Sequence, residues 1–388
     1  MNSIIVPKRV MILSGEPSGD FHGSRLVREL KRLDNSIVFS GIGGDRLADQ
    51  GVRLFYNIDR LSAMGLTEVI GQFGQIKKAF DLFRTELASF RPDLIILVDY
   101  PGFNLKAAKF AKAHYQVKIL YYITPKVWAW KKSRLKSIRK YTDHAALILP
   151  FEEKIYRRAK IACTYVGNPL MDEYPEPVNR HGNGHKVSDG SGQSGITIGL
   201  LPGSRKSEIK NLLKIMVNAG LIIHEKKPKT RFLISMADCL SEDFFETIFS
   251  SLECNNEIFE FEKGPVKNIF QRADLVIAAS GTVTLEAALC RVPTIIIYKM
   301  SYISYRIAKI VVRIKYAGLA NLIAGRMVMP ELLQYDATPG KIAGKALYML
   351  DNLLYFENKL DQVRTLLGRK GAAVRTARIA LDMLCNLR

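Results

Sequence analysis

Short runs of consecutive apolar residues alternate along this chain with longer segments whose apolar positions recur at helical spacing. The runs cover residues 9–13, 37–39, 93–99, 118–122, 145–149, 196–201, 231–235 and 274–278. The first is followed by Leu26, Val27, Leu30 and Leu33, which have the spacing of a buried helical face. Continuous apolar strands separated by helices are typical of a parallel sheet covered on both faces. The pattern therefore predicts an α/β fold with doubly wound, Rossmann-like sheets.

The alternation stops once, in a segment dominated by glycine, proline, serine, asparagine and histidine. We interpret residues 171–195 as a linker or inserted loop, because no apolar period survives there. The chain then divides into a first domain, residues 1–170, and a second domain, residues 196–364. We expect a helix over residues 365–388 to pack back onto the first domain. Two such domains predict a central cleft, with ligands at the carboxyl ends of the strands.

Composition excludes several classes of protein. Of the 388 residues 48% are hydrophobic and 24% charged, which excludes a disordered or fibrous chain. The longest apolar runs, such as residues 292–298, are far shorter than the ~20 residues that span a bilayer. The five cysteines form no Cys-x-x-Cys pair, and the six histidines no His-Glu-x-x-His motif. We expect reduced thiols in a cytoplasmic protein, with no metal and no cofactor.

Basic residues are in excess and are clustered. Lysine and arginine number 57 and the acids 37, which leaves a net charge of +20. Residues 287–330 and residues 126–140 each contain basic residues and no acid, interleaved with aromatic side chains. Such clusters suit a nucleic acid, or an anionic membrane surface or phosphorylated lipid. A solvated basic surface is the third interpretation.

One predicted helix, within residues 65–83, carries an unusually long apolar stripe. Its members include Leu66, Val69, Ile70, Phe73 and Ile76. The stripe is either an ordinary core-facing side or a surface that contacts lipid or membrane.

Three glycine-containing turns follow predicted strands. The first, residues 14–20, places Glu16, Ser18 and Gly19 at the start of a helix, where backbone N–H groups can approach an oxygen-rich ligand. The second combines Gly203, Ser204 and Arg205, a set that suits a diphosphate, although Arg205 has Glu208 within one helical turn as an alternative partner.

The third turn is formed by Ser280, Gly281 and Thr282. Glu286 follows one helical turn later, either to accept ribose hydroxyls or to close a capping box. None of the three turns has the Gly-Lys-Ser/Thr of a Walker A loop. The second domain is therefore predicted to bind a nucleotide diphosphate without a dedicated metal.

Asp99 ends a buried strand and is a candidate general base, with a helix cap as the alternative. The only two tryptophans, Trp128 and Trp130, stand beside cations in the first basic cluster. They are either core residues or contacts for an amphipathic substrate.

A series of motifs runs in order along nearly the whole chain. They are SGEPSGD at 14–20, GIGGDRLADQG at 41–51, MGLTEVI at 64–70, PDLIILVDYPGFN at 92–104, TPKVWAW at 124–130, PFEEKIY at 150–156, VGNPLMD at 166–172, LLPGSRKSEI at 200–209, ASGTVTLEAAL at 279–289 and GLANLIAGRMVMPELLQ at 318–334. Together they resemble the lipid-A-disaccharide synthases, inverting glycosyltransferases of GT-B architecture that act in lipid A and lipopolysaccharide biosynthesis.

The resemblance implies a reaction and roles for single residues. UDP-2,3-diacylglucosamine would donate its sugar to 2,3-diacylglucosamine 1-phosphate (lipid X), giving a disaccharide 1-phosphate and UDP. Asp99 matches the family's proposed base and Arg205 its essential arginine, which we assign to the diphosphate. Asn321 matches an asparagine near the nucleotide, and Glu286 the acid that binds ribose. Ser18 with Gly19 matches the family's N-terminal turn.

The resemblance also gives the basic clusters an explanation, since both substrates are amphiphiles with phosphates. We expect peripheral association with the inner membrane, to which the apolar stripe within residues 65–83 would add lipid contact. We expect no nucleic-acid partner, and a homodimer stays open. Three positions depart from the family pattern. Gly102 replaces a second acid after Asp99, Asn168 replaces a common histidine, and residues 179–195 look inserted.

The sequence is also compatible with two other functions. One is another GT-B enzyme that acts on UDP-sugars, such as an epimerase or a cell-wall glucosaminyltransferase. The other is a basic nucleic-acid-binding protein, which the lack of an RNP, KH or zinc-finger signature disfavours.

Overall fold

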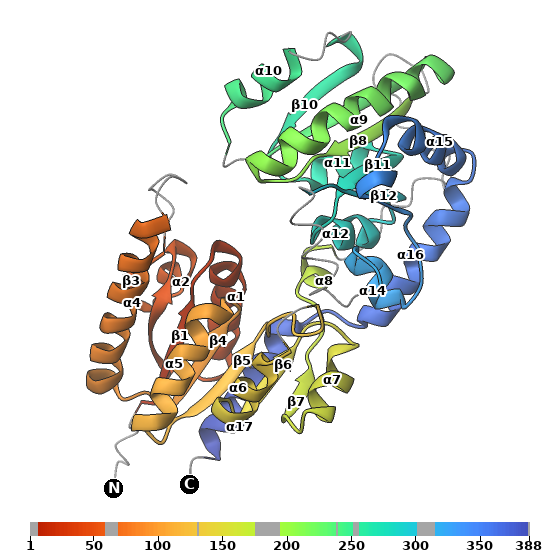
Figure 1. Ribbon diagram of the computed structural model, residues 1–388. Helices are drawn as coiled ribbons and strands as arrows, with labels where there is room; N and C mark the ends of the chain where they lie inside the picture. Colours follow the sequence, from red (N-terminus) through yellow and green to blue (C-terminus); the bar gives the residue numbers. More distant parts are fainter. Residues whose placement is uncertain are drawn as a thin grey trace, which may run out of the picture. The chain divides into compact units, whose positions relative to one another are not determined.

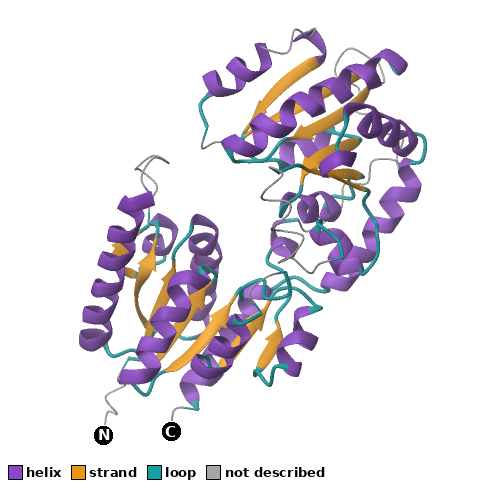
Figure 2. Cartoon of the chain, in the orientation of Figure 1, coloured by secondary structure: helices purple, strands orange, loops and turns teal. Residues whose placement is uncertain are grey.

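The protein is described by a computed structural model, which covers residues 7–58, 69–129, 132–174, 195–237, 240–250, 256–300 and 315–386 (Figure 1). Two compact units make up the chain. The first consists of Met1–Asp172 and Arg369–Arg388, and the second of Glu173–Gly368. Each unit is a parallel sheet with helices on both faces, as the alternating pattern predicts (Figure 2).

The first unit contains a seven-stranded sheet in the order β3-β2-β1-β4-β5-β6-β7. Its strands are β1 (Arg9–Ser14), β2 (Val38–Gly43), β3 (Arg53–Asn57), β4 (Leu94–Val98), β5 (Lys118–Tyr122), β6 (His144–Leu147) and β7 (Cys163–Tyr165). Its helices are α1 (Pro17–Leu33), α2 (Asp45–Asp49), α4 (Val69–Phe90), α5 (Pro101–His114), α6 (Arg134–Tyr141), α7 (Glu152–Arg158) and α17 (Ala372–Cys385), and the short α8 (Leu170–Glu173) lies at the boundary of the two units.

Alternate residues of β1 belong to two hydrophobic cores, one on each face of this sheet. Met11 and Leu13 face Phe83 of α4 and Phe103 of α5, whose rings pack edge to face 6.3 Å apart. Val10 and Ile12 belong to the opposite core, which α1 and α17 cover. The period-2 alternation of a strand thus distributes one apolar run between two layers of helices.

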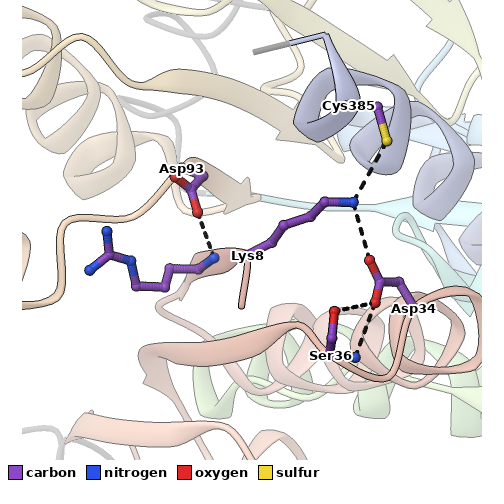
Figure 3. Close-up of polar contacts among 6 residues, drawn as sticks. Lys8, Asp34, Ser36, Asp93 and Cys385 are labelled. Atoms are coloured by element: carbon purple, nitrogen blue, oxygen red, sulfur yellow. Dashed lines mark hydrogen bonds and ion pairs between the residues drawn. The ribbon is translucent and has the colours of Figure 1, made fainter. Parts of the chain in front are cut away.

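The start of the described chain and its last helix lie side by side in the first unit (Figure 3). The Lys8 Nζ donates to the Asp34 carboxylate at 3.2 Å and to the Cys385 Sγ at 3.7 Å, while the backbone N–H of Arg9 donates to Asp93 at 2.7 Å. Lys8 thus links α17 to the end of α1, and the Arg9 bond links the start of β1 to the residue before β4.

The second unit contains a six-stranded parallel sheet in the order β10-β9-β8-β11-β12-β13. Its strands are β8 (Ile196–Leu201), β9 (Thr230–Met236), β10 (Phe259–Lys263), β11 (Leu275–Ala279), β12 (Thr294–Tyr298) and β13 (Glu331–Leu333). Its helices are α9 (Lys206–Lys226), α10 (Glu242–Ser250), α11 (Lys267–Arg272), α12 (Val283–Leu289), α14 (Leu319–Ala324), α15 (Pro339–Leu350) and α16 (Leu353–Leu367), with short 3₁₀ turns η1 (Asn256–Ile258) and η2 (Gln334–Asp336).

Both sheets reverse their strand order at one place. In the first unit β1 pairs with β4, so that Ser14 lies opposite Val98 at the carboxyl edge. In the second unit β8 pairs with β11, where Leu201 lies opposite Ala278. Open α/β sheets bind ligands outside the carboxyl ends of the strands at such a reversal. The turns that the sequence singles out all follow these four strands.

Candidate functional site

The candidate base stands in a strained turn between β4 and α5. Asp99 has φ +46° and Tyr100 has φ +43°, the left-handed region that side chains other than glycine rarely adopt. Each such residue costs about 1–3 kcal/mol and persists only where its surroundings enforce it. Strain of this kind gathers at functional sites, so the turn is a candidate on geometry as well as on sequence.

Two side chains hold this turn in place. The Asn104 side chain, which is 0% exposed, donates from Nδ2 to the carbonyl oxygens of Asp99 (2.7 Å), Val98 (3.2 Å) and Leu13 (3.3 Å). The Tyr121 hydroxyl donates to the same Asp99 carbonyl at 2.9 Å. The backbone that carries the Asp99 carboxylate is therefore fixed from two directions.

The surroundings of Asp99 also tune its acidity. Burial raises the pKa of the Asp99 carboxyl, while Lys126, the backbone N–H of Tyr100 and Arg134 act in the opposite direction. A carboxylate with a raised pKa is a stronger base, and it still ionises because cations lie nearby. Gly102 is exposed, and a Cβ there would meet no atom within 4 Å. A side chain at this position would therefore extend into open space.

The loop that carries Lys126 is anchored by a buried glutamate. Glu152, 1% exposed, accepts from the Trp128 indole N–H at 3.0 Å and from the Leu149 backbone N–H at 3.1 Å. Burial raises the pKa of Glu152 to about 7. Trp128 also packs edge to face on Phe151. Trp128 therefore has a structural partner, and Trp130 lies outside the described residues.

The first glycine turn packs against the Asp99 turn. A Cβ added at Gly15 would overlap the Tyr100 ring, so glycine is needed there for close approach. Glu16 and Ser18 are exposed at the start of α1, and Gly19 is buried against Ser14. The structure thus places the N-terminal turn beside the candidate base.

In the second unit the turn between β8 and α9 is open to solvent. Gly203 has φ +108°, and a Cβ there would overlap the Glu208 carboxylate. Ser204 is exposed, and the Arg205 side chain is 77% exposed. The Arg205 Nη1 donates to the Glu208 Oε1 at 3.2 Å. The alternative partner that the sequence left open for Arg205 is present in the structure.

The neighbouring turn, after β11, also presents exposed residues. Gly281 and Thr282 are exposed, while the Ser280 hydroxyl donates to the Ala317 carbonyl at 2.9 Å. The Thr282 side chain makes no cap hydrogen bond to α12, so the capping-box interpretation of Glu286 is wrong. The half-buried Glu286 instead accepts from the Tyr174 hydroxyl at 2.6 Å. Burial raises the pKa of Glu286, and the Tyr174 bond partly offsets this.

Asn321 differs from the other candidates because it is 0% exposed. Its Nδ2 donates to Met329 O and to the Glu331 carboxylate, both at 2.7 Å, and its Oδ1 accepts from the N–H groups of Val328 and Met329. All four hydrogen bonds of the amide are thus used within the protein. These bonds tie α14 to the segment that enters β13, and the predicted place of Asn321 near the nucleotide stays a prediction.

The apolar stripe of α4 is only partly described. Ile76 packs against the core of the first unit with Phe80, and Phe83 is 0% exposed. Ile76 is half-buried on this core-facing side, and its contact with lipid stays a prediction. The side chains of Val69, Ile70 and Phe73 and the whole of Leu66 lie outside the described residues.

Sequence reasoning missed three residues that shape these sites. Asn104 and Tyr121 hold the Asp99 turn, and Tyr174 binds Glu286. A signal existed for Asn104, since it ends the PGFN segment that follows Asp99. Tyr174 fell in the predicted linker, yet it is 6% exposed and its carbonyl accepts from Arg364 at 3.1 Å.

Neither a metal cluster nor a spanning helix is found in the part of the chain that the structure describes. Within those residues no group of three or more His, Cys, Asp and Glu side chains could hold a metal ion. Nor is any described helix long and apolar enough to cross a membrane.

Comparison with known proteins agrees with the resemblance that the motifs carry. The family model of "Lipid-A-disaccharide synthetase" matches residues 10–381. The lipid-A-disaccharide synthase of Geobacter sulfurreducens is 38% identical over 379 residues, which cover 97% of each chain.

Two solved structures share the fold. They are MurG of Acinetobacter baumannii (TM-score 0.57, 14% identity, 97% of this chain and 100% of that one) and the UDP-GlcNAc 2-epimerase of Neisseria meningitidis bound to UDP-GlcNAc (TM-score 0.61, 11% identity, 97% and 99%). The predicted two-domain GT-B architecture is confirmed.

Proposed function

Because this chain belongs to the lipid-A-disaccharide synthase family, we propose that its Asp99 turn and the turns of its second unit carry out that family's reaction. The family is one of hexosyltransferases that condense UDP-2,3-diacylglucosamine with 2,3-diacylglucosamine 1-phosphate in lipid A biosynthesis. The epimerase and the glucosaminyltransferase that were rivals on sequence share the fold at low identity, whereas the relatives at 38% identity carry the synthase name.

Asp99 serves as the general base in this proposal. Its carboxylate takes the proton of the acceptor hydroxyl while the oxygen attacks the anomeric carbon of the donor sugar, and the bond to UDP breaks on the opposite side. The observation that carries the assignment is the strained turn, locked by Asn104 and Tyr121. A fixed base with a raised pKa needs no rearrangement in the transition state.

The leaving group is assigned to the second unit. Arg205, with the backbone at Gly203 and Ser204, would bind the diphosphate and offset the charge that grows on it as the sugar leaves. The backbone N–H groups of Ser280, Gly281 and Thr282 would add donors, and Glu286 would accept the ribose hydroxyls. Tyr174 holds Glu286 by one hydrogen bond, which a ribose hydroxyl can replace or share.

Asn321 acts on the third glycine turn indirectly, through Glu331 and the segment that Glu331 binds. Glu331 accepts from Asn321 and from the backbone N–H groups of Ala317 and Gly318, and Ser280 donates to the Ala317 carbonyl. The asparagine therefore stabilises the segment at Ala317, which accepts a hydrogen bond from Ser280 of the third glycine turn. We assign it a positioning role.

A two-substrate assay with the purified chain tests the function. UDP release and the lipid disaccharide 1-phosphate should appear in equal amounts when both acylated substrates are present. UDP-N-acetylglucosamine should replace the diacylated donor poorly. UDP release without disaccharide, or turnover of UDP-N-acetylglucosamine alone, would overturn the proposal.

Membrane association is the second part of the proposal, and it is supported by the exposed cations of α6. Lys136, Arg139 and Lys140 lie exposed on this helix, and each basic side chain near an anionic bilayer contributes about 1 kcal/mol. The enzyme would then work peripherally on the cytoplasmic side of the inner membrane.

Co-sedimentation with anionic vesicles is the measurement. Changing the three α6 cations to glutamine should reduce binding strongly, whereas the same change at Lys210, Lys214 and Lys226 of α9 serves as a control with equal charge. Equal losses in both variants would refute a specific membrane face. Sedimentation equilibrium tests the homodimer that the sequence left open.

A further inference from the structure

The first unit contains an apolar pocket at the carboxyl edge of its sheet. Its apolar lining comes from two strands, the segment that follows β3, and the two helices on one face of the sheet: Leu13, Ile42, Ile58, Ile76, Ala79 and Phe103. Among the described residues that line it there is no Lys, Arg, Asp or Glu. Such a lining suits a hydrocarbon group rather than a sugar or a phosphate.

One end of this pocket adjoins the candidate base. Tyr100, the residue after Asp99, lines the pocket together with Ser14 and Gly15, and Asn104 lines it from α5. An acyl chain in the pocket would therefore have its polar end beside the Asp99 turn. This is where the acceptor sugar must lie if Asp99 takes its proton.

Asn104 supplies an unmatched polar group at this end. Its Nδ2 makes three hydrogen bonds to carbonyl oxygens, but its buried Oδ1 has no partner among the described residues. A buried acceptor that is left unsatisfied costs about 1–3 kcal/mol. An N–H group on a ligand would satisfy it, whereas an ester oxygen would not.

We propose that this pocket receives one acyl chain of the acceptor, and that the amide N–H which joins that chain to the sugar donates to the Asn104 Oδ1. The inference rests on the proposed function and names the part of the acceptor that the first unit recognises. Burial of hydrocarbon supplies the affinity, and the amide bond fixes how far the chain enters.

Filling the pocket provides the test. Ala79→Leu adds three carbons at a lining position of α4, and Ala88→Leu makes the same change at an exposed position of the same helix. The kcat/KM of each purified enzyme is measured with acceptors of decreasing acyl length. Burial is worth about 0.8 kcal/mol for each methylene, so the unchanged enzyme should lose about fourfold for each methylene removed.

In Ala79→Leu this dependence should flatten, and the kcat/KM for the longest acceptor should fall at least about tenfold. Ala88→Leu should behave as the unchanged enzyme. Thermal unfolding of both variants checks the fold, and Ala79→Val, a smaller filling, replaces Ala79→Leu where the larger side chain unfolds the protein. A chain-length dependence that the filled variant retains would overturn the inference.

The outcomes also separate the pocket from the function. If the unchanged enzyme makes no disaccharide, the proposed function fails before the pocket is tested. If Ala79→Leu instead weakens binding to phospholipid vesicles and keeps the acceptor dependence, the pocket holds a bilayer chain and the inference is wrong. An acceptor with an ester in place of the amide should lose about tenfold in kcat/KM, and no loss would remove Asn104 from recognition.

Discussion

The two turns to which the reaction is assigned are built in opposite ways. The Asp99 turn is strained, half-buried and held by Asn104 and Tyr121. The turn that carries Arg205 is exposed, and its guanidinium donates to the Glu208 carboxylate at 3.2 Å. One turn is thus fixed before any ligand binds, while the other presents a cation whose partner a ligand can replace.

The difference follows from what each group must do. A general base works only at the right position and with the right pKa, and packing provides both. An arginine that binds a diphosphate gains most of its energy from the anion itself, and an exposed ion pair of about 0.2–1 kcal/mol is easily exchanged for it. Variants at the two turns should therefore separate turnover from UDP binding.

The largest effect is expected for Asp99→Asn. The amide keeps the size of the side chain but cannot take a proton, so kcat should fall about 10²–10⁴-fold. UDP affinity, measured by calorimetry, should stay within about twofold of the unchanged enzyme. Turnover near that of the unchanged enzyme would remove Asp99 from the mechanism.

Arg205→Ala should show the opposite pattern. Loss of a charge-assisted hydrogen-bond donor costs about 1.5–3 kcal/mol, so UDP should bind about 10–150-fold more weakly, and turnover should fall with it. Because this side chain is 77% exposed, the free energy of unfolding should change by less than about 0.5 kcal/mol. Unchanged UDP affinity would contradict the diphosphate assignment.

Lys126→Met tests whether the environment of Asp99 sets its basicity. Burial raises the pKa of Asp99 and Lys126 opposes this, so removing the cation should raise that pKa further. The base acts when ionised, and kcat/KM falls as pH drops through this pKa. The acid limb of the profile should therefore move to higher pH, with no change in alkaline solution. Lys109→Met on the exposed side of α5 is the control, and equal profiles for both variants would separate Lys126 from Asp99.

The fold was predictable because a continuous apolar run indicates a buried parallel strand even when its neighbouring strands are unknown. Residues 118–122 and 196–201 coincide with β5 and β8. Five of the described strands were not predicted: β3, β7, β10, β12 and β13. The strands β7 and β13 have three residues each at a sheet edge, which carry too little apolar signal, whereas the apolar run at 292–298 was noted but not assigned to a strand. The predicted linker began too early, because Asp172 accepts from Gly371 and Tyr174 from Arg364, contacts that depend on residues far along the chain.

Sequence motifs located the turns but not the role of each side chain within them. Asn321 and Arg205 both stand in motifs of the family, yet one is fully buried and bonded while the other is exposed. That distinction depends on Glu331 and on the loop before it, which bond to Asn321 from another element, a contact that residue types do not signal. The strain at Asp99 was likewise invisible, since nothing in the residue types signals a left-handed aspartate.

The smallest effect is expected for Glu208→Gln. This variant tests most directly whether a ligand can replace Glu208 as the partner of Arg205. Removing the carboxylate releases Arg205 and also removes a negative charge near the diphosphate, so UDP should bind about twofold more tightly, within the range of an exposed pair. Glu225→Gln, at an exposed position near the other end of α9, removes the same charge and should have no effect. If affinity falls instead, Glu208 holds Arg205 in its binding orientation, and the second turn is fixed in advance as the first one is. Combining Glu208→Gln with Arg205→Ala decides between these outcomes, because an effect transmitted through the guanidinium must disappear when the guanidinium is absent.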